Sequence, residues 1–145
     1  MIKYNTAKNA QIGCDNMILN CGNKMMNTYL YSIKDGYVMI DTGYEDSLKM
    51  VQARLEENHL SFNDVRYVFL THAHDDHAGF LKELLIKYPQ IKVICHPLAI
   101  EVLTKGENSF DGYCTGIIAY LYCKILEAFG KKSNRFPRID DFFAR

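Results

Sequence analysis

The chain has 145 residues, of which 48% are hydrophobic and 23% are charged, the balance of one globular domain built around one core. Its 17 Lys and Arg residues equal its 17 Asp and Glu residues, so bulk charge gives no indication of a nucleic acid partner. The five cysteines contain no C-x-x-C pair, which indicates reduced thiols, and the first fifteen residues lack the apolar stretch of a signal peptide. We therefore expect a cytoplasmic protein.

The N-terminal part of the chain predicts loops and a β-hairpin. Residues 1–28 are polar and predict loops with one or two short strands. Residues 29–33 and 37–40 are β-favouring runs, and the Lys34-Asp35-Gly36 turn between them predicts a hairpin.

Helices and strands then alternate. Apolar spacing predicts an amphipathic helix over 46–58, and the run VRYVFL predicts a buried strand over 65–70. A helix over 81–88 must stop before Pro89, and residues 91–95 predict another strand. Pro97 can start a further helix that ends near Gly106. This alternation predicts an α/β fold with ligand sites at the carboxyl ends of strands.

The segment from Gly112 to Gly130 is long and apolar. Lys124 and Glu127 interrupt it, whereas a membrane span needs about 20 largely uncharged residues. We therefore expect no membrane partner. We interpret this segment as a helix that is either buried in the fold or forms a homodimer through residues 112–130.

The stretch THAHDDHAGF, residues 71–80, follows the predicted strand 65–70 and concentrates residues that bind metals. His72 and His74 are two positions apart, so in an extended segment they project to the same side and can share one metal ion. Asp76 and His77 are adjacent and diverge unless the backbone turns, which suits a second metal about 3.5 to 4 Å from the first.

Imidazole nitrogens with a carboxylate oxygen suit Zn²⁺ best, and Fe and Mn stay open because affinity alone does not select among them. The motif contains no cysteine, which argues against a structural Cys-rich zinc site. His59 and His96 stand alone in the sequence, and we expect neither to bind metal.

The motif T-H-x-H-x-D-H-x-G at 71–79 resembles the signature of the metallo-β-lactamase superfamily. Asp41-Thr42-Gly43 resembles the family's "IDTG" strand end, and Asn27–Leu30 resembles its "N-x-Y-L" strand. The resemblance implies the first half of a metallo-β-lactamase-like αββα sandwich with a helical extension. Phe80 stands where many members have a second glycine, a departure that affects loop packing.

The resemblance also implies a two-zinc site. His72 and His74 would bind the first metal, Asp76 and His77 the second, and Asp41 would steady the motif loop. A hydroxide between the metals would attack a small-molecule ester, thioester, lactone or phosphodiester, with Asp76 aligning the hydroxide and taking up its proton. The terminal histidine makes the likeness closer to glyoxalase II, the lactonases and ribonuclease Z.

The family's site needs a third histidine, a bridging aspartate and a last histidine from later in the chain. His96 is not where the family places a ligand, and Asp140 and Asp141 lack the preceding histidine. We therefore expect a truncated domain, inactive by itself. Its expected parts are an N-terminal half (1–110), an apolar helical insertion or lid (111–132) and an incomplete connection (133–145).

Three functional hypotheses follow. The first is a metal-dependent hydrolase, for which changing His72 and His74 to Ala should abolish zinc binding. The second is a small non-catalytic interaction module with a vestigial or weak metal site. The third is a mononuclear-iron oxidoreductase similar to the persulfide dioxygenases.

Overall fold

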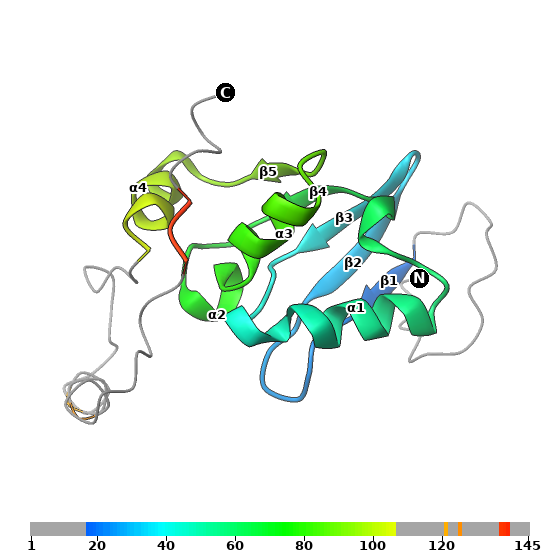
Figure 1. Ribbon diagram of the computed structural model, residues 1–145, viewed down its shortest axis with the longest axis horizontal. Helices are drawn as coiled ribbons and strands as arrows, with labels where there is room; N and C mark the ends of the chain where they lie inside the picture. The colour runs from blue at the N-terminus through cyan, green and yellow to red at the C-terminus, as the bar shows by residue number, and fades with distance from the viewer. Residues whose placement is uncertain (1–16, 107–120, 122–124, 126–136, 140–145) are drawn as a thin grey trace.

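The computed structural model describes residues 17–106, 121, 125 and 137–139 (Figure 1). These residues form one mixed sheet of five strands in the order β1-β2-β3-β4-β5, together with helices, so the predicted α/β class is confirmed. The elements are β1 (Ile18–Asn20), β2 (Tyr29–Ile33), β3 (Gly36–Ile40), η1 (Glu45–Ser47), α1 (Leu48–Glu57), η2 (Phe62–Asp64), β4 (Val65–Phe69), α2 (Asp75–Ala78), α3 (Leu81–Lys87), β5 (Lys92–Ile94) and α4 (Pro97–Lys105).

The sheet changes from antiparallel to parallel in its middle. Strands β1, β2 and β3 pair antiparallel, and the predicted hairpin is confirmed by the pairing of Ile33 with Gly36. Gly36 has φ 140°, a conformation that side chains disfavour. Strands β3, β4 and β5 pair in parallel, so their carboxyl ends lie at the same end of the sheet.

Helices α1 and α3 lie over one face of the sheet (Figure 1). On the core face the register places Leu30 beside Met39 and Met39 beside Val68, and all three side chains are fully buried. Fully burying one such side chain contributes about 1.5–3 kcal/mol. Side chains at the alternate strand positions point to the opposite face of the sheet. There Phe69 pairs with Ile94, and these side chains are 43% and 44% exposed.

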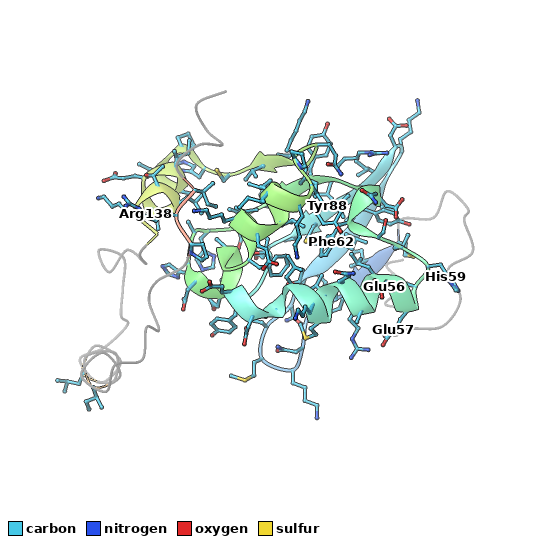
Figure 2. The ribbon with its side chains drawn as sticks, viewed as in Figure 1. Glu56, Glu57, His59, Phe62, Tyr88 and Arg138 are labelled. Atoms are coloured by element: carbon cyan, nitrogen blue, oxygen red, sulfur yellow. The ribbon has the colours of Figure 1, made fainter. Side chains whose placement is uncertain are left out.

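Aromatic rings fill the space between the helical layer and the sheet. Phe62 lies 5.3 Å from the ring of Tyr88, and Figure 2 shows these two side chains together. Phe80, the predicted departure from the family pattern, is fully buried, and its ring centroid lies 6.4 Å from that of Phe62 in an edge-on contact. The bulky residue at this position therefore extends the core.

Local signals explain where the later helices begin and end. Helix α3 ends at Lys87, two residues before Pro89, as proline requires. Helix α4 begins at Pro97, with His96 Nδ1 accepting a hydrogen bond from the backbone N–H of Leu98 at 3.2 Å. It ends at Lys105, and the next residue, Gly106, caps it with a left-handed φ of 67°. His96 is thus a helix cap.

Residues 137–139 lie against the last turn of α4. Ile139 is buried, and its backbone N–H donates to the carbonyl of Leu103 at 3.1 Å. Arg138 Nε donates to the carbonyl of Thr104 at 3.0 Å (Figure 2). The division predicted around 110 and 132, and the dimer predicted through 112–130, fall mainly outside the described residues. Within the described ranges no helix is long and apolar enough to cross a membrane.

Candidate metal centre

The candidate metal centre forms where the loops that follow β3 and β4 meet. The backbone N–H and the hydroxyl of Thr42 both donate to the carbonyl of His77, at 2.7 and 3.0 Å. The backbone N–H of Gly79 donates to the carbonyl of Gly43 at 2.9 Å. These bonds fasten the histidine motif to the end of β3, the neighbouring parallel strand.

Gly79 allows this close contact because it has no side chain. Its φ is −58°, an ordinary helical value, so positive φ is not what requires glycine here. A Cβ at this position would lie 2.4 Å from the backbone nitrogen of Glu45 and 2.5 Å from the carbonyl oxygen of Asp75. Real Cβ atoms do not approach backbone atoms so closely, so any other residue would push the motif away from η1.

The structure brings three of the four predicted metal ligands into one group. His72, Asp76 and His77 each offer a ligand atom within 4.8 Å of the others. The ring of His72 lies 3.9 Å from that of His77, and Nε2 of His77 lies 3.5 Å from Asp76 Oδ2. His74 lies outside this group, with its ring 4.7 Å from that of His72. Helix α2 turns the backbone so that Asp76 and His77 face His72.

The donor set of this group fits a metal ion. Two imidazoles and one carboxylate suit zinc, and they also suit iron and manganese. Four tetrahedral ligand atoms about 2.0–2.1 Å from a metal lie about 3.4 Å from one another. The observed spread of up to 4.8 Å is wider, so the ligand atoms would have to move closer together to hold an ion. His72 is exposed and the other two are half-buried, so an ion can reach the group from solvent.

Asp41 holds the motif together beneath these ligands. Its carboxylate is buried, and its Oδ1 accepts a bond from the backbone N–H of Thr71 at 2.8 Å. Its Oδ2 accepts from the Thr71 hydroxyl and contacts His77 Nδ1, each at 2.8 Å. Asp41 has φ 58°, a left-handed conformation that aspartate tolerates better than most residues. These bonds tie Asp41 to the motif loop, and its role beside a bound metal stays a prediction.

The pKa values at the site diverge from their ordinary values. Burial acts to raise the pKa of Asp41, but hydrogen bonds from His77 and Thr71 outweigh it and lower that pKa. Burial acts to lower the pKa of His77, but its bond to Asp41 and the charge of Asp76 raise it overall. Burial, with the neighbouring rings of His77 and His74, lowers the pKa of His72. A lowered pKa favours the neutral imidazole of His72, which is the form of histidine that binds metal.

Two threonines contribute to the site without having been predicted to do so. The motifs at 41–43 and 71–79 include Thr42 and Thr71 but indicate no role for their side chains. In the structure the Thr42 hydroxyl donates to the motif backbone at His77, and the Thr71 hydroxyl donates to Asp41. Sequence spacing carries no signal for these bonds because they join residues 30 or more positions apart. His59, by contrast, lies at the end of α1 and is exposed, away from the site (Figure 2).

The sheet with its helical layer and the histidine–aspartate group at the strand ends define an α/β domain with a candidate metal centre. Residues 22–139 match the sequence model of the metallo-beta-lactamase superfamily, and the chain belongs to that superfamily. The predicted family and fold are thereby confirmed.

Solved structures agree on the fold. The metallo-beta-lactamase MIM-1 from Novosphingobium pentaromativorans is 25% identical with a TM-score of 0.65, over 84% of this chain and 39% of that one. BJP-1, a subclass B3 enzyme of Bradyrhizobium japonicum, has a TM-score of 0.67 at 18% identity, over 86% of this chain and 40% of that one. The chain thus spans about two-fifths of these neighbours.

Curated relatives carry the names of redox enzymes. The chain is 29% identical over 92 residues to a coenzyme F420H(2) oxidase of Methanothermobacter thermautotrophicus, covering 59% of this chain and 22% of the relative. It is 34% identical over 79 residues to an anaerobic nitric oxide reductase flavorubredoxin of Pectobacterium atrosepticum, covering 54% and 15%. The chain spans less than a quarter of the length of either relative.

Proposed function

We propose that this chain binds metal through His72, His74, Asp76 and His77 and forms the water-activating part of a metal-dependent hydrolase. The observation that carries the proposal is the convergence of His72, Asp76 and His77 just beyond the carboxyl end of β4. Superfamily membership supports it. The proposed substrate is a small ester, thioester, lactone or phosphodiester.

The chain's own residues hold and orient the ligand atoms. A zinc-type ion held there would supply Lewis acidity and a bound water with a pKa lowered towards about 7. Asp41 holds the Nδ1 side of His77, which leaves Nε2 on the side of Asp76. The half-buried carboxylate of Asp76 is suited to align the attacking water and to accept its proton.

We expect metal binding, and not turnover, from the 145 residues by themselves. A two-metal centre needs more ligands than these four, because each zinc ion takes about four. The activity of a longer protein is likewise a proposal, since the chain covers 22% and 15% of the two curated relatives described above.

Oxidation–reduction at iron is a second candidate function, favoured by a specific observation. Two of the matching curated relatives are named as an oxidase and a nitric oxide reductase, at 29% and 34% identity. Histidine and carboxylate ligands suit iron as well as zinc, so the donor set accommodates both functions.

Equilibrium dialysis against zinc, followed by elemental analysis, tests the metal site. We expect the chain to retain zinc and the double variant His72→Ala/His74→Ala to lose it. The single variants His59→Ala and His96→Ala serve as controls, because these histidines lie outside the motif at 71–80. Unchanged stoichiometry in the double variant would overturn the assignment, and a folded chain without zinc affinity would support the interaction-module hypothesis.

The metal that the protein carries when isolated from its native cells separates the two candidate activities. Paired zinc or manganese would support the hydrolase, and iron would support the redox function. Hydrolysis of nitrophenyl esters and thioesters by that same preparation then tests the proposed reaction directly.

A further inference from the structure

The side chain of Thr71 lies between the buried carboxylate and the first predicted ligand. Its hydroxyl oxygen is 2.8 Å from Asp41 Oδ2 and 3.0 Å from His72 Nδ1. The imidazole of His77 reaches the same Oδ2 atom directly, at 2.8 Å. One carboxylate oxygen is thus connected to two histidines, to His77 directly and to His72 through a hydroxyl group.

The donors and acceptors in this chain of contacts allow one arrangement of protons. An ionised carboxylate only accepts hydrogen bonds, and a threonine hydroxyl has a single proton to donate. That proton goes to Asp41, so the contact between Thr71 Oγ1 and His72 requires the proton to be on Nδ1 of His72. A neutral imidazole has one N–H, so Nε2 of His72 carries the lone pair.

We propose that Thr71 is a positioning residue that transmits the hydrogen bonding of Asp41 to His72 and selects the tautomer that binds metal through Nε2. The proposal rests on the proposed metal site and adds the residue that prepares one of its ligands. Metal-binding histidines commonly donate their second N–H to a carboxylate or carbonyl, which fixes the ring and the tautomer. Here a hydroxyl occupies that place, and the backbone N–H of Thr71 is itself held by Asp41 Oδ1 at 2.8 Å.

Two substitutions at Thr71 separate this role from simple packing. Thr71→Val keeps the shape of the side chain and removes the hydroxyl, whereas Thr71→Ser keeps the hydroxyl and removes the methyl group. Thr71 is exposed, so neither change creates a buried cavity. Thr104→Val is the matched control, because its hydroxyl donates to the carbonyl of Glu101 on α4, outside the site.

The first measurement is the tautomer of His72 by ¹⁵N–¹H NMR of the metal-free chain at pH 8, where an ordinary imidazole is neutral. We expect the Nδ1–H form in the wild-type chain, in Thr71→Ser and in Thr104→Val. We expect Thr71→Val to lose that single form. Retention of the Nδ1–H form in Thr71→Val would overturn the role of Thr71.

The second measurement is zinc affinity by competition with a chromogenic chelator. Removing such an orienting group typically weakens metal binding about 10- to 100-fold, and we expect Thr71→Val to fall in that range. Thr71→Ser and Thr104→Val should retain wild-type affinity. A wild-type chain without zinc affinity would overturn the proposed function. A wild-type chain that binds zinc with His72 in the Nε2–H form would overturn only the role of Thr71.

Discussion

Replacing Asp41 by Asn tests the hydrogen bonds that organise the candidate metal centre before any metal binds. Asp41 accepts bonds from the Thr71 backbone and hydroxyl and from His77, each at 2.8 Å. An amide offers one oxygen and one NH₂ group in place of two oxygens. If the amide oxygen accepts the bond from the Thr71 backbone, the NH₂ group takes the place of Oδ2. It then faces the Thr71 hydroxyl and His77 Nδ1, which both donated hydrogen bonds to Oδ2.

The loss of stability can be worked out from these contacts. A hydrogen bond to a charged group contributes about 1.5–3 kcal/mol. Two such bonds are affected, and rotation of the hydroxyl and a change of imidazole tautomer recover part of them. We therefore expect Asp41→Asn to lower the free energy of unfolding by about 2–4 kcal/mol. Asp41→Ala should cost roughly 1–2 kcal/mol more, because alanine tolerates the φ of 58° less well than asparagine.

Urea unfolding followed by far-UV circular dichroism, at pH 7 with EDTA present, provides the measurement. Asp35→Asn is the matched control, because Asp35 lies exposed in the hairpin turn and uses its backbone carbonyl, at 2.8 Å, to accept a bond from Arg66. An Asp41→Asn chain as stable as the wild type, within about 0.5 kcal/mol, would refute the reasoning, since ordinary surface changes lie in that range.

The pH dependence of stability should change in the same variant. The pKa of Asp41 is lowered in the folded state, so its contribution is present above about 3.9 and is lost as pH falls through the folded-state value. The pKa of His77 is raised, so its contribution is present below about 6.5 and is lost as pH rises through its folded-state value. Asp41→Asn should flatten both changes, and an unaltered pH profile would contradict the pairing of these two groups.

Three further predictions concern a close contact, a buried thiol and a proton. Gly79→Ala should destabilise the chain by about 1–3 kcal/mol in urea unfolding, because its Cβ would overlap backbone atoms. Cys21 should react with iodoacetamide at pH 8 more slowly than Cys95 in the folded chain, as peptide mass mapping over time would show. Burial raises the pKa of both thiols, that of Cys21 to about 12, but Cys21 is fully buried whereas Cys95 is half-buried. Zinc binding near pH 7 should release a proton from His77, measurable by calorimetry in two buffers of different ionisation enthalpy.

Each of these expectations has an outcome that contradicts it. Unchanged stability of the Gly79 variant would mean that η1 and the motif are not in contact. Rapid labelling of Cys21 in the folded chain would mean that β1 and its neighbours do not cover the thiol. Equal binding enthalpies in the two buffers would mean that His77 is already neutral before zinc binds.

The sequence by itself determined the local elements and the ligand-type residues of the candidate metal centre. The helix α1 and the strands β2 to β5 were predicted because side-chain direction repeats every 3.6 residues in a helix and every two in a strand. Apolar residues that face the core therefore recur at these spacings in the sequence. Pro89, Pro97 and Gly106 marked helix ends for equally local reasons. The ligand-type residues of the motif and the family they indicate needed no tertiary information, because the pattern is contiguous.

Only the tertiary structure decided how the site is assembled. The parallel pairing of β3 with β4 brings Asp41 within 2.8 Å of Thr71 and His77, 30 and 36 positions later. The turn of α2 then groups Asp76 and His77 with His72, where spacing alone had paired His72 with His74. These outcomes depend on strand pairing and on backbone contacts between distant segments, and such non-local geometry leaves no periodic trace in the residues that take part.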